Sequence, residues 1–188
     1  ELEWTALAYA LYLPPEREWG NRYGERYSFD ELVTELLGRP LNEGSCGGMH
    51  IVYTLTILAR VDHQVPILSE PVRGRLWQWL RRCVEVAVDT QQEDGCWLID
   101  WNRALLPEKS AKGPSPDTAS SQAGLFGTLL ATSHLAEWML YLPEELQVPD
   151  EVLRRAAWWL YGQLKQKDRE TQQRFFCPYS HATYVLRK

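Results

Sequence analysis

The first pair of side chains suited to chemistry is Cys46 and His50, in the string Gly-Ser-Cys-Gly-Gly-Met-His that starts at Gly44. We expect this string to open a helix, where free N–H groups and the helix dipole favour anions and thiolates. His50 would then lie one turn beyond Cys46 on the same face, within reach as a base for a nucleophilic thiol. The alternative is close packing, in which the glycines let backbones approach and both side chains are simply buried.

His134 and Glu137 form a second pair, within an apolar stretch that we predict to be a buried helix. A histidine beside a carboxylate can serve acid–base chemistry or hold a metal. If the helices that carry His50 and His134 are both inner helices, the two imidazoles would line one cavity. The alternative is a satisfied polar network in the core. The cysteine spacings match neither a zinc knuckle nor a redox motif, so the sequence predicts no metal centre and no cofactor.

Trp97, Asp100 and Trp101 are the candidate ligand-binding residues. Aromatic rings beside a carboxylate are typical of sugar sites. They are equally typical of packing at the edge of a helical fold, so both interpretations stand.

The composition bounds what kind of protein this is. The chain has 188 residues, a net charge of −5, 45% hydrophobic residues and nine tryptophans, which fits one folded domain. An acidic chain argues against nucleic acid as a partner. His134 and Glu137 interrupt the longest apolar run, so we expect no membrane span. A small molecule or a protein is the expected partner, while oligomeric state, disulfide state and compartment stay open, since no targeting segment is visible and Glu1 is not methionine.

Helical periodicity dominates, and strand-like alternation is scarce. A capping box, Ser28 with Glu31, marks one helix start, and Pro14-Pro15 ends the first helix. Between helices lies a long loop, residues 100–116. The predicted helices cover residues 2–13, 28–37, 45–61, 70–90, 117–141 and 150–167.

Short strings recur along the chain, which indicates helical-hairpin repeats. Leu11-Tyr-Leu-Pro recurs at Leu140, and a shift of 80 residues superimposes four further positions. Each hairpin would bury its first helix and expose the outer face of the second. The expected hairpins cover residues 1–38, 45–97 and 117–168 of a single domain. The superimposed positions are Val72, Arg75, Trp79 and Leu80 on Val152, Arg155, Trp159 and Leu160.

The string Gln91-Gln-Glu-Asp-Gly-Cys-Trp97 ends the fourth predicted helix. It resembles the Gln-x-x-Asp-Gly-x-Trp signature of terpene cyclases, protein prenyltransferase β subunits and complement-type thioester domains. Physically, Gly95 would permit a left-handed turn, Trp97 would fold back as a packing anchor, and Gln91 would bond free carbonyls at the helix end. The resemblance spans roughly residues 45–168 and implies an all-α fold, with helical hairpins in a partial or small α/α toroid.

The catalytic motifs of those families are missing from this sequence. It contains neither the Asp-x-Asp-Asp acid motif nor the Asp-Asp-x-x-Asp metal motif, nor the Asp-x-Cys start of a prenyltransferase zinc set. At the place that resembles the thioester motif, Met49 stands where a glutamine would be needed, so a thioester is excluded there.

The favoured function is therefore a toroid-like domain that binds a ligand or a partner in its concave face without those motifs. One alternative is a terpenoid or lipid cyclase-like enzyme, in which aromatic side chains stabilise a carbocation. The other is a carbohydrate-active enzyme, since several of these also use α/α toroids. Fold analogy alone does not choose among them.

Overall fold

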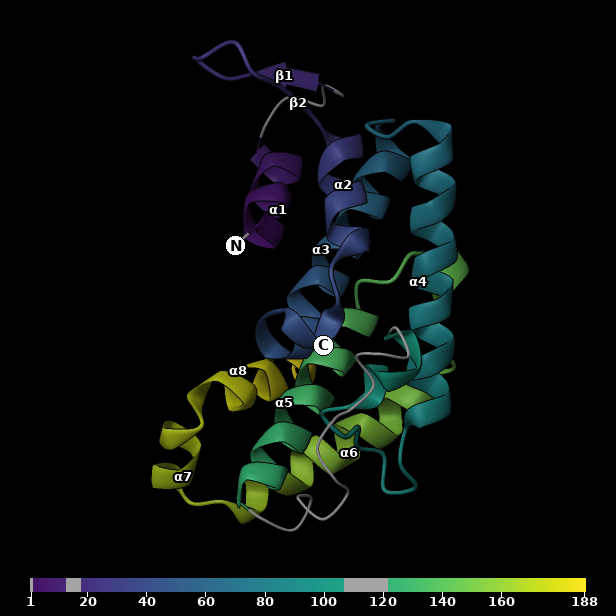
Figure 1. The fold of residues 1–188 in the computed structure, drawn as a ribbon. Coiled ribbons are helices and arrows are strands. Elements are labelled where there is room, and N and C mark those ends of the chain that lie inside the picture. Colours follow the sequence, from purple (N-terminus) through teal and green to yellow (C-terminus); the bar gives the residue numbers. More distant parts are fainter. Residues whose placement is uncertain (1, 13–17, 107–121) are drawn as a thin grey trace. The chain divides into compact units, whose positions relative to one another are not determined.

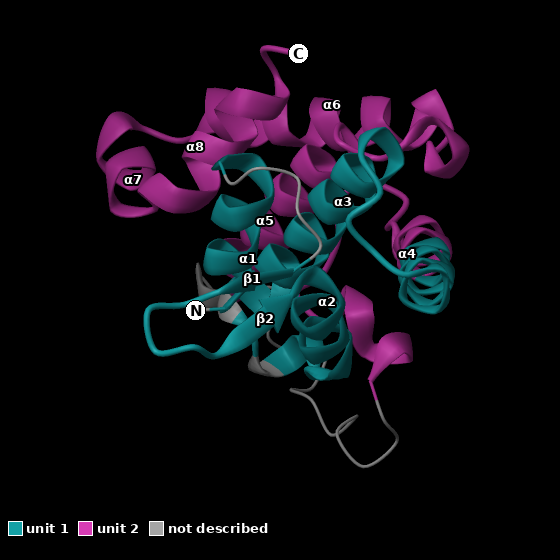
Figure 2. Ribbon diagram, turned by 90° about the horizontal axis from the view of Figure 1, so that it is seen from above, with its two compact units in different colours: residues 1–82 teal, residues 83–188 magenta. Residues whose placement is uncertain are grey.

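The computed structural model describes residues 2–12, 18–106 and 122–188 (Figure 1). In these residues it contains eight α-helices and one two-stranded sheet, which confirms the predicted all-α class. The chain divides into two compact units, residues 1–82 and residues 83–188 (Figure 2). The toroid arrangement and the single domain stay predictions.

Unit 1 holds three packed helices and a β-hairpin. Helix α1 packs most extensively on α3, and α2 contacts both (Figure 1). The core between them is apolar, with Ala6, Val33, Leu36 and Val52 fully buried. The elements are α1 (Leu2–Tyr12), β1 (Glu18–Gly20), β2 (Arg26–Ser28), α2 (Phe29–Gly38), the 3₁₀ turns Leu41–Glu43 and Ser45–Gly48, α3 (Met49–Gln64) and the beginning of α4 (Glu70–Thr90).

The predicted capping box at the start of α2 is confirmed. The Ser28 side chain accepts a hydrogen bond from the Glu31 backbone N–H, and the Glu31 carboxylate accepts one from the Ser28 N–H. The hairpin just before it was not predicted. Asn21 organises its turn, since the Asn21 side-chain oxygen accepts hydrogen bonds from the N–H groups of Tyr23 and Glu25.

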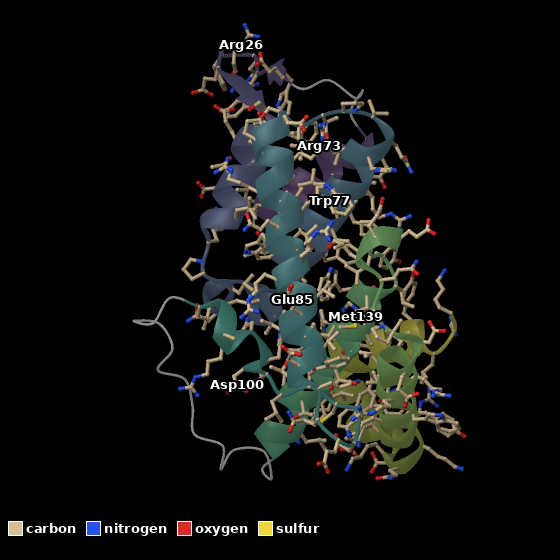
Figure 3. The ribbon with its side chains drawn as sticks, turned by 90° about the vertical axis from the view of Figure 1, so that its right-hand side faces the viewer. Arg26, Arg73, Trp77, Glu85, Asp100 and Met139 are labelled. Atoms are coloured by element: carbon tan, nitrogen blue, oxygen red, sulfur yellow. The ribbon has the colours of Figure 1, made fainter. Side chains whose placement is uncertain are left out.

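A buried carboxylate fixes the turn between α3 and α4. Asp62 is 2% exposed and accepts hydrogen bonds from the N–H groups of Ile67 and Leu68, at 2.9 and 2.8 Å. Arg73 of α4, labelled in Figure 3, donates to the same carboxylate from Nε at 2.5 Å. Its hydrogen bond to Asp62 raises the pKa of the Arg73 guanidinium. The buried charge is therefore fully paired, as such groups must be.

Unit 2 is built around α5, which packs against α8 and α6. The buried face of α5 includes Leu135, Ala136 and Trp138. None of the described helices is both long enough and apolar enough to cross a lipid bilayer. The elements after α4 are the 3₁₀ turn Trp101–Leu105, α5 (Gln122–Met139), the 3₁₀ turn Glu144–Leu146, α6 (Asp150–Gln166), α7 (Arg169–Arg174) and α8 (Phe176–Val185).

Several predicted boundaries need correction. The third helix begins at Met49, not at residue 45, because Cys46, Gly47 and Gly48 have left-handed backbone angles that cannot continue a right-handed helix. A cap by Asp150 at the start of the sixth helix, which the sequence also predicts, is wrong: Asp150 is the first residue of α6, and Pro149 occupies the cap position. The Pro14-Pro15 stop, most of the predicted loop and the predicted start of the fifth helix at residue 117 lie outside the described residues. Cys46, Cys83, Cys96 and Cys177 form no disulfide in the described part of the chain.

Candidate functional site

Two residues of the Gln-x-x-Asp-Gly-x-Trp segment, Gly95 and Trp97, have the structural roles that their residue types predicted. Gly95 has φ +94°, and a Cβ there would lie 2.5 Å from the backbone oxygen of Arg155. Trp97 is fully buried, and its indole N–H donates to the Ala87 carbonyl at 2.6 Å. The amide nitrogen of Gln91 donates to two carbonyls, those of Gly95 and Val152. The predicted bonding of Gln91 to carbonyls at the helix end is therefore wrong, because neither acceptor belongs to the last turn of α4. Gln91 instead bonds within its own loop and ties that loop to the first turn of α6.

The candidate ligand-binding residues of this region lie mostly inside the protein. Trp97 is 0% exposed and Trp101 is 3% exposed, so neither ring offers a stacking face to solvent. Asp100 is half-buried. Ligand binding by this set stays a prediction, which would require the indoles to leave their packing.

Cys46 and His50 lie in unit 1, at the entry to α3. Their ligand atoms lie within 4.8 Å of one another. Cys46 has φ +53° and belongs to a 3₁₀ turn, while His50 is the second residue of α3. The expected position of Cys46 in the first helical turn is therefore wrong. His50 packs against the ring of Trp4, with the ring centroids 4.8 Å apart.

His134 and Glu137 lie in unit 2, on the same side of α5. His134 is 6% exposed, and its Nδ1 is 2.9 Å from the Leu130 carbonyl oxygen. A carbonyl only accepts, so in the neutral ring Nδ1 carries the proton and Nε2 carries the lone pair. The hypothesis that His134 shares a cavity with His50 stays a prediction, because the two residues belong to different units.

His181 of α8 completes a compact group with the α5 pair. The Glu137 carboxylate accepts a hydrogen bond from Nδ1 of His181. The His134 and His181 rings lie 4.0 Å apart, centroid to centroid. As at His134, an oxygen acceptor at Nδ1 leaves Nε2 of the neutral His181 ring with the lone pair.

Cys177 supplies a thiol to the same place. It lies four residues before His181, one turn away on the same side of α8. Ligand atoms of His134, Cys177 and His181 all lie within 4.8 Å of one another. Cys177 is exposed, His181 is half-buried and His134 is buried, so the group reaches from the core of unit 2 to its surface.

This group, which we call the α5–α8 cluster (His134, Glu137, Cys177 and His181), has the donors of a transition-metal site. Two imidazoles and one thiolate are ligands that Zn²⁺ prefers. Metal-binding histidines usually donate their other N–H to a carbonyl or carboxylate, as both do here. In a tetrahedral zinc site the ligand atoms are about 3.3–3.8 Å apart, as follows from bond lengths of about 2.0–2.3 Å. A side-chain adjustment of about 1 Å would close the cluster around an ion.

Sequence reasoning missed Cys177 and His181, although a signal was available. Both cysteine–histidine pairs have the spacing Cys-x-x-x-His. A search for that spacing would have found the second pair. What it would not have found is the pairing of α8 with α5, which brings His134 and Glu137 to the thiol.

The other thiols of unit 2 are buried and have a different character. Burial and the neighbouring Asp94 carboxylate raise the pKa of the Cys96 thiol to about 12. Cys83 is fully buried. Cys177 is therefore the exposed cysteine of this unit, and the one best placed to meet a metal from solution.

Comparisons with protein-family models, with curated proteins and with solved structures give no match for this chain.

Proposed function

We propose that unit 2 binds a divalent transition metal of the zinc class through His134, Cys177 and His181. The observation that carries this proposal is the convergence of the three ligand atoms within 4.8 Å, with both Nδ1 atoms held by oxygen acceptors. Three protein ligands leave a fourth position for water or a further ligand, which is the arrangement of zinc sites that act on bound molecules. Zinc would act as a Lewis acid on the molecule bound at the fourth position.

The elements of unit 2 suit this role. Helices α5 and α8 form the most extensive helix contact in the described chain, so the ligands stand on packed elements. Holding the rings in one tautomer lowers the cost of ordering them when the metal binds. Exposure of Cys177 gives the ion a path from solvent. This site supports a binding function that needs none of the catalytic motifs that the sequence lacks.

Cobalt(II) titration of the purified chain tests the proposal, because tetrahedral cobalt absorbs visible light and a thiolate ligand adds a charge-transfer band. We expect one equivalent of Co²⁺ to bind and Zn²⁺ to displace it. Cys177→Ser should remove the charge-transfer band, whereas Cys46→Ser, which changes the other Cys-x-x-x-His pair, should leave it intact. Equal spectra for the two variants, or no cobalt spectrum from the wild-type chain, would refute the site.

Glu137 would act as a positioning residue through His181. Its carboxylate holds the ring by the Nδ1 hydrogen bond, and loss of such outer partners lowers metal affinity by about 10–100-fold. We expect Glu137→Gln to weaken zinc binding by about 10-fold in a chelator competition, because an amide accepts the bond without its charge. Glu144→Gln, at an exposed glutamate, is the matched control. An unchanged affinity in Glu137→Gln would remove Glu137 from the site.

A further inference from the structure

The outer face of α6 carries a stripe of exposed side chains that is unusual in composition. Trp158 is 69% exposed and Tyr161 is 47% exposed, and their rings meet edge to face at 6.0 Å. Exposed charges lie at both ends of the stripe. Glu151 forms an ion pair with Arg154 at one end, and Lys165 lies over the Tyr161 ring at the other. The spacing of these residues follows the helical repeat, so they form one continuous face.

The corresponding face of α4 has no aromatic residues at the equivalent positions. The same shift of 80 residues that relates the buried positions of the two helices places Gln78 opposite Trp158 and Arg81 opposite Tyr161. Both α4 residues are polar and exposed, as an outer helix face normally is. The buried positions agree, since Val72, Leu76 and Leu80 match Val152, Ala156 and Leu160, which are all buried. The aromatic pair is therefore a local addition to α6 that core packing does not require.

A hollow lies beside the aromatic pair. Its volume is about 330 Å³, and it is lined by Arg154, Ala157, Trp158, Tyr161 and Leu186. The lining is almost entirely apolar, and Arg154 supplies the charge at its edge. A hollow next to a protruding indole can receive a large side chain from a facing helix, as in knobs-into-holes packing.

The charges around Trp158 are arranged to complement the same face of another copy. Glu151 and Lys165 each lie seven residues from Trp158, on opposite sides of it. Two turns of helix separate each charge from the indole, on one face. If two α6 helices cross in antiparallel register at Trp158, Glu151 of each copy, which also pairs with Arg154 of its own helix, faces Lys165 of the other. In a symmetric dimer this contact occurs twice, because the same patch serves both copies.

We propose that α6 is the contact surface of a two-fold symmetric dimer of this chain. Trp158 of each copy would enter the hollow beside Trp158 of the other, and the two Glu151–Lys165 contacts would set the antiparallel register. Gly162 allows close approach, because its Cβ position is open space. One helix pair makes a small interface, so the expected dimer is weak, with a micromolar dissociation constant that increases with salt.

Sedimentation equilibrium of the full chain over a wide concentration range tests the dimer. We expect self-association in the wild type and a monomer for Trp158→Ser. That variant should keep its fold, because the indole is exposed, and circular dichroism checks it. A wild-type chain that stays monomeric at high micromolar concentration would overturn the proposal, as would a Trp158→Ser variant that dimerises as the wild type does.

Charge exchange distinguishes this register from any other self-association. Glu151→Lys alone and Lys165→Glu alone should each be monomeric, because like charges then face each other across the interface. An equimolar mixture of the two variants should associate, since both contacts become complementary, and the double variant should dimerise as the wild type does. Failure of both the mixture and the double variant to associate would reject the antiparallel register.

Discussion

The two Cys-x-x-x-His pairs of this protein have the same spacing but different backbones. In unit 1, Cys46 has left-handed backbone angles and is followed by two glycines of the same hand, so α3 begins only at Met49. In unit 2, Cys177 and His181 lie within one regular helix, α8. Both pairs bring a thiol and an imidazole within 4.8 Å of each other. The Cys-x-x-x-His spacing therefore brings the thiol close to the imidazole in both pairs, although the backbone conformations differ.

The pairs differ in what surrounds the imidazole. His181 donates a hydrogen bond to Glu137 and lies against His134, both from the neighbouring helix of the same unit. Within unit 1, His50 packs on the indole of Trp4. A carboxylate at Nδ1 fixes a tautomer for metal binding, whereas an aromatic face provides packing. Within unit 2, helix α5 adds His134 and Glu137 to the cysteine–histidine pair of α8.

The largest expected effect is on the unit 1 turn itself. A Cβ at Gly48, where φ is +80°, would lie 2.4 Å from the Leu41 carbonyl oxygen. Gly48→Ala should therefore destabilise unit 1 by about 3 kcal/mol, measured by denaturant unfolding. Gly74→Ala is the matched control, because it lies in α4 with open space at its Cβ and should stabilise by up to about 1 kcal/mol. Equal effects of the two substitutions would show that the turn is not constrained.

Removing the imidazole of each Cys-x-x-x-His pair should have different effects on zinc affinity. We expect His181→Ala to weaken zinc binding by about 100-fold or more, since outer partners alone are worth about 10–100-fold. His50→Ala should leave it within about 2-fold if the site belongs to unit 2 alone. Competition with a chromogenic chelator measures both. A larger loss in His50→Ala than in His181→Ala would transfer the site to the other pair.

Alkylation with iodoacetamide at pH 8 should order the thiols by reactivity and test which of the two Cys-x-x-x-His pairs binds zinc. Cys177 is exposed and should react first, while Cys96 should not react in the native state, because a pKa of about 12 keeps its thiol protonated well above pH 8. Zinc at 100 times its dissociation constant should slow Cys177 by about 100-fold through mass action. Mass spectrometry reads each site. Zinc protection of Cys46 in place of Cys177 would contradict the assignment.

The smallest expected effects are the changes in the free energy of unfolding caused by glycine substitutions at Cys46 and at Cys177, which should differ in sign. Cys46→Gly relieves a left-handed non-glycine residue, so we expect the free energy of unfolding to stay level or increase by up to about 1 kcal/mol. Cys177→Gly places glycine in α8 and should cost about 1 kcal/mol. Thermal unfolding without added metal measures both. Destabilisation of similar size at both positions would mean that Cys46 is held by contacts and not merely tolerated.

Local signals in the sequence predicted what depends on neighbouring residues. The capping box at Ser28, the left-handed turn at Gly95 and the buried anchor Trp97 were all predicted and are confirmed. At Ser28 and Gly95, backbone sterics or a bond within a few residues decides the outcome. Where the same reasoning failed, as at the entry to α3, three consecutive left-handed residues replaced a helical turn.

Long-range pairings could not be predicted in the same way. Three features depend on which helix faces pack together. They are the bond of Arg73 to Asp62, the exposure of Trp158 and the approach of His181 to Glu137. An aromatic residue on an amphipathic helix usually packs in the interior, yet Trp158 is 69% exposed. Periodicity identifies the apolar face of α6, but it does not show which of two adjacent tryptophans, Trp158 or Trp159, is exposed.

The sequence by itself determined an all-α chain, the positions of most helices and the structural roles of Gly95 and Trp97 in the Gln-x-x-Asp-Gly-x-Trp segment. These follow from propensity, capping and turn chemistry, which act over a few residues. Only the tertiary structure decided that α8 returns to α5 and brings Cys177 and His181 to His134 and Glu137. The physical reason is that a metal site requires donor atoms from separate helices within a few ångströms, and packing of the two helix faces sets that distance.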